Sequence, residues 1–220
     1  TDHNPLYGKV DPYWGGVNAV VESMRNVASI GATPHALTDC LCFGNPEKEN
    51  QMWEFVESVK GISDACRSLT LKHSPSDPTP IIAGNVSFYN ESKSGAIPPS
   101  PIVSCLGKID DINNAIGMSF TSPNSTIVLI GKRKNELGGS AYYHLFNKLG
   151  NKIPKPDLSE VKNQIYALTD CINSGLVLSC HDISDGGIAV ALAEMSFKNN
   201  LGCDVQIESN FENDVLLFSE

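Results

Sequence analysis

Apolar residues follow a helical spacing in two stretches near the start of the chain, with an apolar run between them. The first stripe begins after Asp11-Pro12, a pair that suits a helix start, and continues to Ala28. The second stripe runs from Met52 to Cys66, and the apolar run from His35 to Phe43 has the length of a buried strand. We therefore expect two helices that flank one strand.

The same pattern of apolar and polar positions continues through the rest of the chain. It predicts strands at residues 81–83, 102–106, 126–130 and 176–179 and near Val205 and Leu216, and helices after Ser140, at 158–172 and at 188–197. Strand and helix alternate throughout, which indicates a mixed α/β (α+β) fold. Because the pattern resets around residues 110–118, we expect two units, residues 1–113 and 114–220.

The balance of charges restricts the classes of partner. Acidic residues number 25 against 16 Lys and Arg, the net charge is −9, and no long basic run occurs, so a surface for nucleic acid or an anionic membrane is disfavoured. No apolar run approaches the ~18 residues of a membrane span, and the first residues lack the pattern of a secretory leader, so we expect a cytoplasmic protein. The chain starts without Met and stops within an apolar run, and we expect it to be an excised fragment.

Cysteines are scattered through the apolar stretches and are odd in number. No C-x-x-C pair, the usual sign of a zinc site, occurs among them. We interpret all seven as reduced, buried thiols. They are Cys40, Cys42, Cys66, Cys105, Cys171, Cys180 and Cys203.

Asp39 is a candidate site residue because it lies in the middle of an otherwise apolar predicted strand. A buried carboxylate is costly unless it is paired or bound to a cation. One interpretation is structural, with Asp39 accepting hydrogen bonds from backbone amides of the Gly44-Asn45 turn. The other is that Asp39 contacts a metal ion or a nucleotide. The residue pattern leaves both open.

The segment Gly84-Asn85-Val86-Ser87 follows a short predicted strand, a place where α/β sheets often bind ligands. Glycine lets the backbone approach a phosphate closely, an Asn carbonyl is a hard oxygen ligand suited to Mg²⁺, and a Ser hydroxyl can donate a hydrogen bond. The structural alternative is a tight turn with an Asx-type hydrogen bond. The segment alone is a weak signal.

A further group of polar residues and glycines occupies His181-Asp-Ile-Ser-Asp-Gly-Gly187, at a predicted helix start. Amides at a helix start attract anions, but the two carboxylates would repel a phosphate unless a metal bridged them. The simpler interpretation is that Ser184 or Asp185 caps the helix and that the glycines form the turn. Ser140 is a candidate cap of the same kind. No P-loop and no G-x-G-x-x-G motif is present, so any nucleotide is held by another scheme.

Six segments, in order, carry a resemblance to a known family: Asp11–Gly16, Asn26–Ala32, Ala36–Lys48, Gly84–Glu91, Leu137–Ser140 and His181–Gly187. Together they resemble the phosphoribosylformylglycinamidine (FGAM) synthases of the small, multi-subunit type, relatives of aminoimidazole ribonucleotide synthetase. The resemblance covers nearly the whole chain. It implies an internally duplicated parent chain, in which residues 1–113 are the later part of the second N-type, ATP-binding domain and residues 114–220 are a second C-type domain truncated at its C-terminus.

The resemblance also implies an activity. FGAM synthases are ATP-dependent C–N ligases of purine biosynthesis that convert formylglycinamide ribonucleotide, ATP and glutamine-derived ammonia to the amidine, ADP and phosphate. The implied cofactors are ATP and Mg²⁺. The implied partners are the remainder of the synthase chain, a glutaminase subunit and a small assembly subunit.

The site residues implied by the resemblance lie in the two segments that were ambiguous on their own. Asp39 and Gly84 align with ATP contacts, Asn85 with a Mg²⁺ ligand and Ser87 with a substrate contact, whereas no catalytic residue aligns within this chain. We therefore expect the fragment alone to be inactive. Two departures from the family pattern occur: Cys42 stands where the family usually has Asn, and residues 71–80 form a longer stretch.

Two alternatives to a catalytic role stay open. The chain could supply a non-catalytic nucleotide-binding scaffold half of the synthase. It could also belong to a related kinase or synthetase of the same superfamily, although the run from Phe43 to Lys48 differs from the kinase signature.

Overall fold

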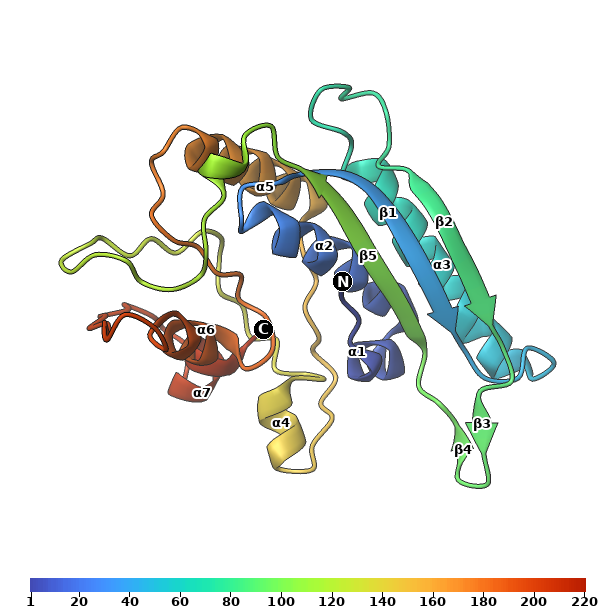
Figure 1. The fold of residues 1–220 in the computed structure, drawn as a ribbon. Helices are drawn as coiled ribbons and strands as arrows, with labels where there is room; N and C mark the ends of the chain where they lie inside the picture. The colour runs from blue at the N-terminus through green and yellow to red at the C-terminus, as the bar shows by residue number, and fades with distance from the viewer.

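The computed structural model describes all 220 residues, and its only sheets lie in the first half of the chain (Figure 1). Two helices precede the first strand, and a third helix separates that strand from the next. The elements are α1 (Pro5–Val10), α2 (Pro12–Ala28), β1 (Thr33–Cys42), α3 (Glu49–Ser68), β2 (Ile81–Ser87), the short hairpin β3 (Glu91–Ser92) and β4 (Gly95–Ala96), and β5 (Ser100–Lys108).

The main sheet has three strands in the order β2-β1-β5. Strand β1 pairs with β2 in parallel and with β5 in antiparallel orientation, so the sheet is mixed. Figure 1 shows α2 and α3 on one face of this sheet, whereas no helix covers the opposite face. We call the uncovered side the open face.

The hydrophobic core lies between the sheet and its helices. Leu37 and Leu41 are four residues apart on β1, so both side chains project toward α2 and α3. There they join Val20 and Met24 in a cluster of 15 buried residues. Ile165 is the one member of this cluster that comes from beyond residue 108. The core therefore belongs almost entirely to the first half of the chain.

Glycines bring α2 and α3 into close contact. A Cβ atom at Gly61 would lie 2.0 Å from the backbone oxygen of Tyr13, and one at Gly16 would lie 2.3 Å from the backbone oxygen of Ser58. Because no larger residue fits at either position, these glycines set the distance between the two helices.

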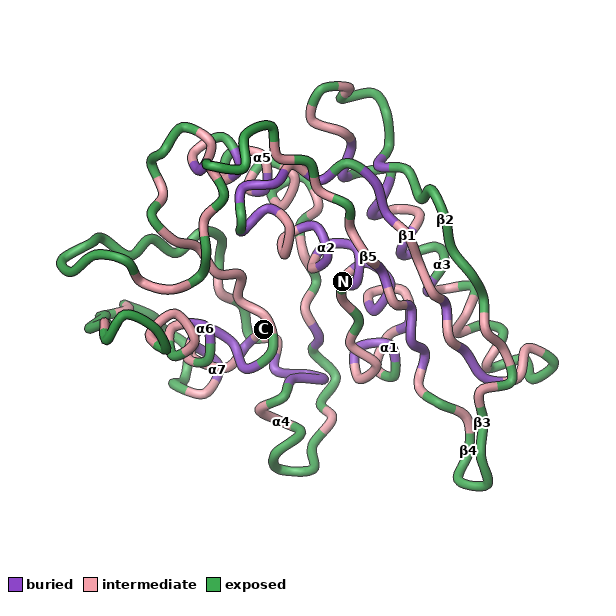
Figure 2. Tube along the Cα trace, viewed as in Figure 1, coloured by how far each residue is buried: buried purple, intermediate pink, exposed green.

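The second half of the chain contains helices and irregular segments. The helices are η1 (Ile112–Asn114), α4 (Ala141–Leu145), α5 (Leu158–Asn173), α6 (Gly187–Met195) and α7 (Asn213–Phe218). Helix α5 packs against α2 and α3, and α6 packs against α7. Figure 2 shows buried residues concentrated in β1, β5 and α2, while β2 and much of the second half are exposed or half-buried.

The mixed α/β fold class and the long predicted helices are confirmed, but several predicted strands are wrong. Residues 126–130, 176–179 and those around Val205 form no strand, and Leu216 lies in α7. An apolar run indicates a segment that can be buried or paired, but it does not specify the strand with which it pairs. In this structure these segments do not pair with one another. Large apolar side chains consequently stay exposed, among them Val128 at 73% and Leu176 at 75%.

The cysteines are all free, as predicted, but only Cys66 is buried. Cys203 is exposed and the other five are half-buried, so the prediction of uniformly buried thiols is wrong. No helix combines the length and apolar character required to cross a membrane.

Candidate functional site

The four site residues implied by the sequence meet on two neighbouring strands. In the parallel register of β1 and β2, Asp39 lies beside Gly84, Cys40 beside Asn85, and Cys42 beside Ser87. The expectation that residues 84–87 follow a strand, or form a tight turn, is wrong. Strand β2 continues through Ser87, which pairs with Cys42 at the end of β1.

Asp39 and Gly84 form a contact that is possible only because glycine has no side chain. A Cβ atom at Gly84 would lie 2.2 Å from Oδ1 of Asp39, so the carboxylate occupies the space above the glycine. Burial raises the pKa of Asp39. The hydrogen bond that the backbone N–H of Asn85 donates to this carboxylate opposes the rise. The amide donor is thus on β2 and not in the Gly44-Asn45 turn, where the N–H of Asn45 instead bonds Oε1 of Gln51.

Asn85 and Ser87 point to the other side of the sheet. Alternation along the strands places them on the open face, while Asp39 shares the helix side with Leu37 and Leu41. The exposed side-chain amide of Asn85 makes no hydrogen bond within the chain. The structure therefore brings the four residues together along the strands but divides them between two faces.

Asn90 is a residue at this site that the sequence reasoning missed. Its side-chain amide donates to Oγ of Ser87 (3.0 Å), to the backbone oxygen of Ser87 (2.9 Å) and to the backbone oxygen of Phe43 (3.0 Å). It thereby joins the ends of β1 and β2 and orients the Ser87 hydroxyl. The residue type was the available signal, since Asn readily bonds nearby backbone groups, but Asn90 lies seven residues beyond the strand predicted at 81–83.

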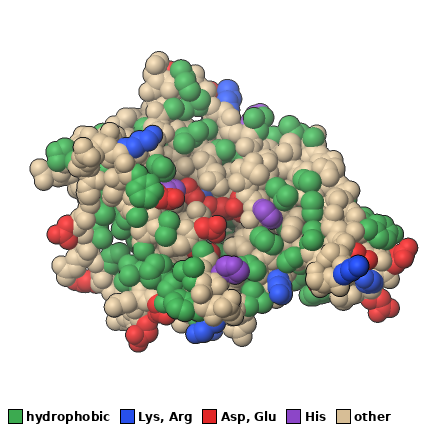
Figure 3. Space-filling view, turned by 60° about the horizontal axis from the view of Figure 1, so that its bottom comes forward, with side chains coloured by type: hydrophobic (Ala, Val, Ile, Leu, Met, Phe, Trp, Pro, Cys, Tyr) green, Lys and Arg blue, Asp and Glu red, His purple; other side chains and the backbone are tan.

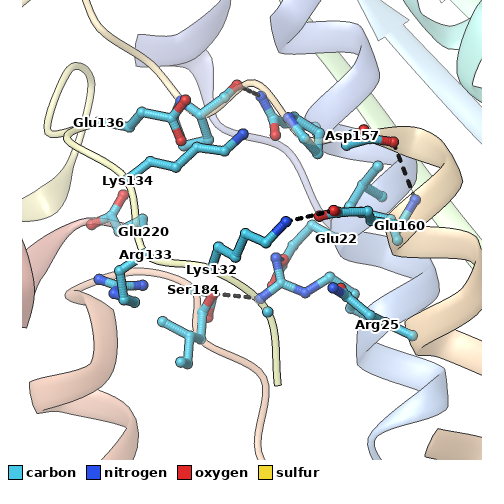
Figure 4. A pocket seen from close by; sticks show the side chains of 18 of the residues that line it. Glu22, Arg25, Lys132, Arg133, Lys134, Glu136, Asp157, Glu160, Ser184 and Glu220 are labelled. Carbon is cyan, nitrogen blue, oxygen red and sulfur yellow. Dashed lines mark hydrogen bonds and ion pairs between the residues drawn. The ribbon is translucent and has the colours of Figure 1, made fainter. Parts of the chain in front are cut away.

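A separate pocket of about 200 Å³ lies between α2 and the second half of the chain (Figure 4). Its lining mixes acids and bases from distant parts of the sequence. Arg25 of α2 donates to the backbone oxygen of Ile183 (2.6 Å) and forms an ion pair with Glu22 (3.2 Å), and Lys132 pairs with Glu160 (2.7 Å). Polar contacts thus connect α2 to the loop at 181–187.

Two carboxyl groups, those of Glu22 and Asp182, influence each other's pKa beside this pocket. Burial raises the pKa of Glu22 well above its usual value despite the charge of Arg25, and a hydrogen bond to Asp182 adds to the rise. Burial also opposes ionisation of Asp182, but the hydrogen bond from Glu22 and the charge of Arg25 keep the pKa of Asp182 low. The pKa shifts of the two carboxyl groups thus have opposite directions, upward for Glu22 and downward for Asp182. Figure 3 shows that acidic side chains gather near the middle of one face of the molecule.

Glu220 connects the glycine-rich segments. Its carboxylate accepts from the hydroxyl of Tyr7, the N–H of Ala141 and the N–H of Gly186, each at 2.8 Å. Ser140 caps α4 as predicted, because its Oγ accepts from the N–H of Tyr143 at 3.1 Å.

The predicted cap of α6 is wrong. Neither Ser184 nor Asp185 caps this helix; the N-cap is Gly186, and its N–H is bonded by the carboxylate of Glu220. The turn itself is made by glycines, as predicted, with φ of +84° at Gly186 and +67° at Gly187.

Two family models match successive parts of the chain. The model for "AIR synthase related protein, N-terminal domain" matches residues 1–109, and that for its C-terminal domain matches residues 122–220. The chain belongs to the AIR synthase related family.

Curated relatives within this family match over the whole chain. The "Phosphoribosylformylglycinamidine synthase subunit PurL" of Methanothrix thermoacetophila is 48% identical over 222 residues, and that of Moorella thermoacetica is 42% identical over 220. Each match covers 100% of this chain but 29% of the relative. The chain thus spans less than a third of the length of these PurL subunits.

Solved structures of the family share the fold. A Thermotoga maritima PurL complexed with FGAR superimposes with a TM-score of 0.72 at 19% identity, covering 100% of this chain and 35% of that one. A hydrogenase maturation protein HypE in complex with ATP gives a TM-score of 0.55 at 15% identity and covers 82% of this chain and 49% of that one. At these identities the likeness shows the AIR synthase related fold and nothing finer.

Proposed function

We propose that this chain forms one side of the active site of an FGAM synthase, the ATP-dependent ligase that makes formylglycinamidine ribonucleotide in purine biosynthesis. Membership in the AIR synthase related family and the 48% identity to a PurL subunit support the proposal. The glutamine-derived ammonia, the glutaminase and assembly subunits, and the cytoplasmic location are part of it. Residues 1–113 and 114–220 are proposed as parts of the N-type and C-type domains of the parent chain's second half.

The register of β1 against β2 is the observation that carries the site assignment. It sets Asp39 beside Gly84. Asn85 and Ser87 follow Gly84 on β2, beside Cys40 and Cys42 of β1. In the proposal, Asp39 and Gly84 contact ATP, Asn85 ligates Mg²⁺ and Ser87 contacts the substrate. Because no catalytic residue is assigned here, the chain alone is expected to be inactive, and the remainder of the synthase would complete the reaction.

The donors present fit Mg²⁺ in kind. Asn85 offers an exposed carbonyl oxygen, and Mg²⁺ is commonly held by few protein oxygens together with water and substrate phosphates. No group of three or more His, Cys, Asp or Glu side chains forms a metal site in the chain, so further ligands would come from ATP and from the rest of the synthase. The ion would neutralise phosphate charge as it develops during transfer.

Removal of the Asn85 oxygen tests this assignment. We expect Asn85→Ala in the full-length synthase, assayed with its glutaminase and small subunit, to require about tenfold more Mg²⁺ for half-maximal activity, because a metal ligand is lost. Asn50→Ala, at an exposed position in α3, is the matched control and should keep the wild-type Mg²⁺ requirement. An Asn85→Ala enzyme with an unchanged Mg²⁺ dependence would refute the metal role.

One observation favours the scaffold alternative. Asp39 lies on the helix side of the sheet, where the charge of Asp39 adds to burial in raising the pKa of Cys66 to about 11, whereas Asn85 and Ser87 lie on the open face. This division would suit a nucleotide held for stability alone. Under that function, Ser87→Ala would leave turnover unaffected while the nucleotide stayed tightly bound to the assembly.

A further inference from the structure

Cys40 and Cys42 form a pair of thiols on the open face of the sheet. They are two residues apart on β1, so their side chains project to the same side, and their sulfur atoms lie 3.7 Å apart. Both are free and half-buried. They are the two cysteines that the structure brings into hydrogen-bonding distance of each other.

The separation of the sulfur atoms suits a bridging metal ion. In tetrahedral zinc sites the Zn–S distance is ~2.3 Å, which places two sulfur ligands about 3.8 Å apart. A disulfide suits the geometry less well, because a two-residue step along a strand spans about 6.6 Å, near the upper limit of the Cα separation that a disulfide tolerates. The pair can thus chelate an ion with little movement of the backbone.

The surroundings of the pair supply polar neighbours and access. Asn85 lies beside Cys40 and Ser87 beside Cys42 in the register with β2, all on the face that no helix covers. No third His, Cys, Asp or Glu joins them, so two thiolates, with water or amide oxygens, would complete the coordination. Such a two-thiolate site exchanges its ion more readily than a closed structural site.

We propose that Cys40 and Cys42 form a binding site for a thiophilic divalent cation, represented by Zn²⁺. Zinc is held by thiolates, so thiols that ligate Zn²⁺ must release their protons to the solvent when the ion binds. Zinc affinity should therefore increase with pH. Neither thiol is among the residues assigned above to ATP, Mg²⁺ or substrate.

Zinc titration of the full-length protein tests the site. Metal-free protein, kept reduced with a phosphine, is titrated calorimetrically with ZnCl₂ in two buffers of different ionisation enthalpy. The wild type should bind one equivalent more than Cys42→Asn or Cys40→Ser, and that equivalent should be accompanied by proton release. Cys203→Ser, which removes an exposed and isolated thiol, should keep it.

Two results would overturn the proposal. One is a Cys42→Asn protein that binds as many zinc equivalents as the wild type. The other is loss of the same equivalent in Cys203→Ser. Thermal unfolding of each variant verifies that it is folded. Because zinc stoichiometry is measured without ATP, this result is separable from the Mg²⁺ dependence of Asn85→Ala.

Discussion

The two halves of the chain are held in different ways. Residues 1–108 surround an apolar core in which Leu37 and Val20 are fully buried. The second half contributes one buried residue to that core, Ile165 of α5, and otherwise adds polar contacts such as that of Arg25 with Ile183 and that of Glu220 with Tyr7. Burial of apolar surface is the larger stabilising force, and hydrogen bonds contribute modestly in net terms. The sheet and its helices are therefore the stable part of the molecule, to which the glycine-rich loops of the second half are attached.

Truncation of matched leucines in the two halves should give the largest contrast. Leu37→Ala opens a cavity in the core and should lower the free energy of unfolding by about 3 kcal/mol. Leu176→Ala, at a side chain that is 75% exposed, should change it by less than about 0.5 kcal/mol. Urea denaturation of both variants measures the difference, and similar losses would mean that the second half is packed as firmly as the first.

The polar contacts of Glu22 should make the stability of the protein decrease as the pH rises. The pKa of Glu22 is raised in the folded protein, so the folded state holds a proton that the unfolded state releases above its value near 4.5. The stability due to this group is present at low pH and is lost as the pH rises through the folded pKa. Glu22→Gln cannot titrate and should show a smaller decrease in stability between about pH 5 and pH 8.

Urea midpoints at several pH values measure this smaller effect. The control is Glu57→Gln, because Glu57 lies on α3 in a surface pair with Lys60. If wild type and Glu22→Gln follow the same pH profile, the pKa of Glu22 is not raised in the folded protein.

Local features of the fold could be predicted from the sequence. The helix at 12–28 depends on spacing, a preceding Asp-Pro pair and a stop signal, all of which lie within the segment itself, and the structure has α2 at Pro12–Ala28. The strand at 126–130 was predicted from an apolar run alone, and it does not form, because pairing depends on residues far away in the sequence.

The candidate site shows the same limit. The residue types of Asp39 and Gly84 were visible as an unusual carboxylate and a permissive glycine, but their contact arises only when β1 and β2 pair in register. The same pairing supplies the Asn85 N–H that replaces the expected turn amides. The division of Asn85 and Asp39 between two faces could not be predicted before the extent of β2 was known.

ATP binding to the full-length synthase with Asp39→Asn tests whether β1 and β2 form one side of the ATP site. This substitution keeps the size of the side chain and its place above Gly84 while it removes the charge. If β1 and β2 form one side of the ATP site, calorimetry should show at least about tenfold weaker ATP binding, whereas Asp110→Asn, whose side chain is 84% exposed, should bind as the wild type does. Equal ATP affinity in Asp39→Asn and wild type would contradict the assignment of Asp39 to an ATP site.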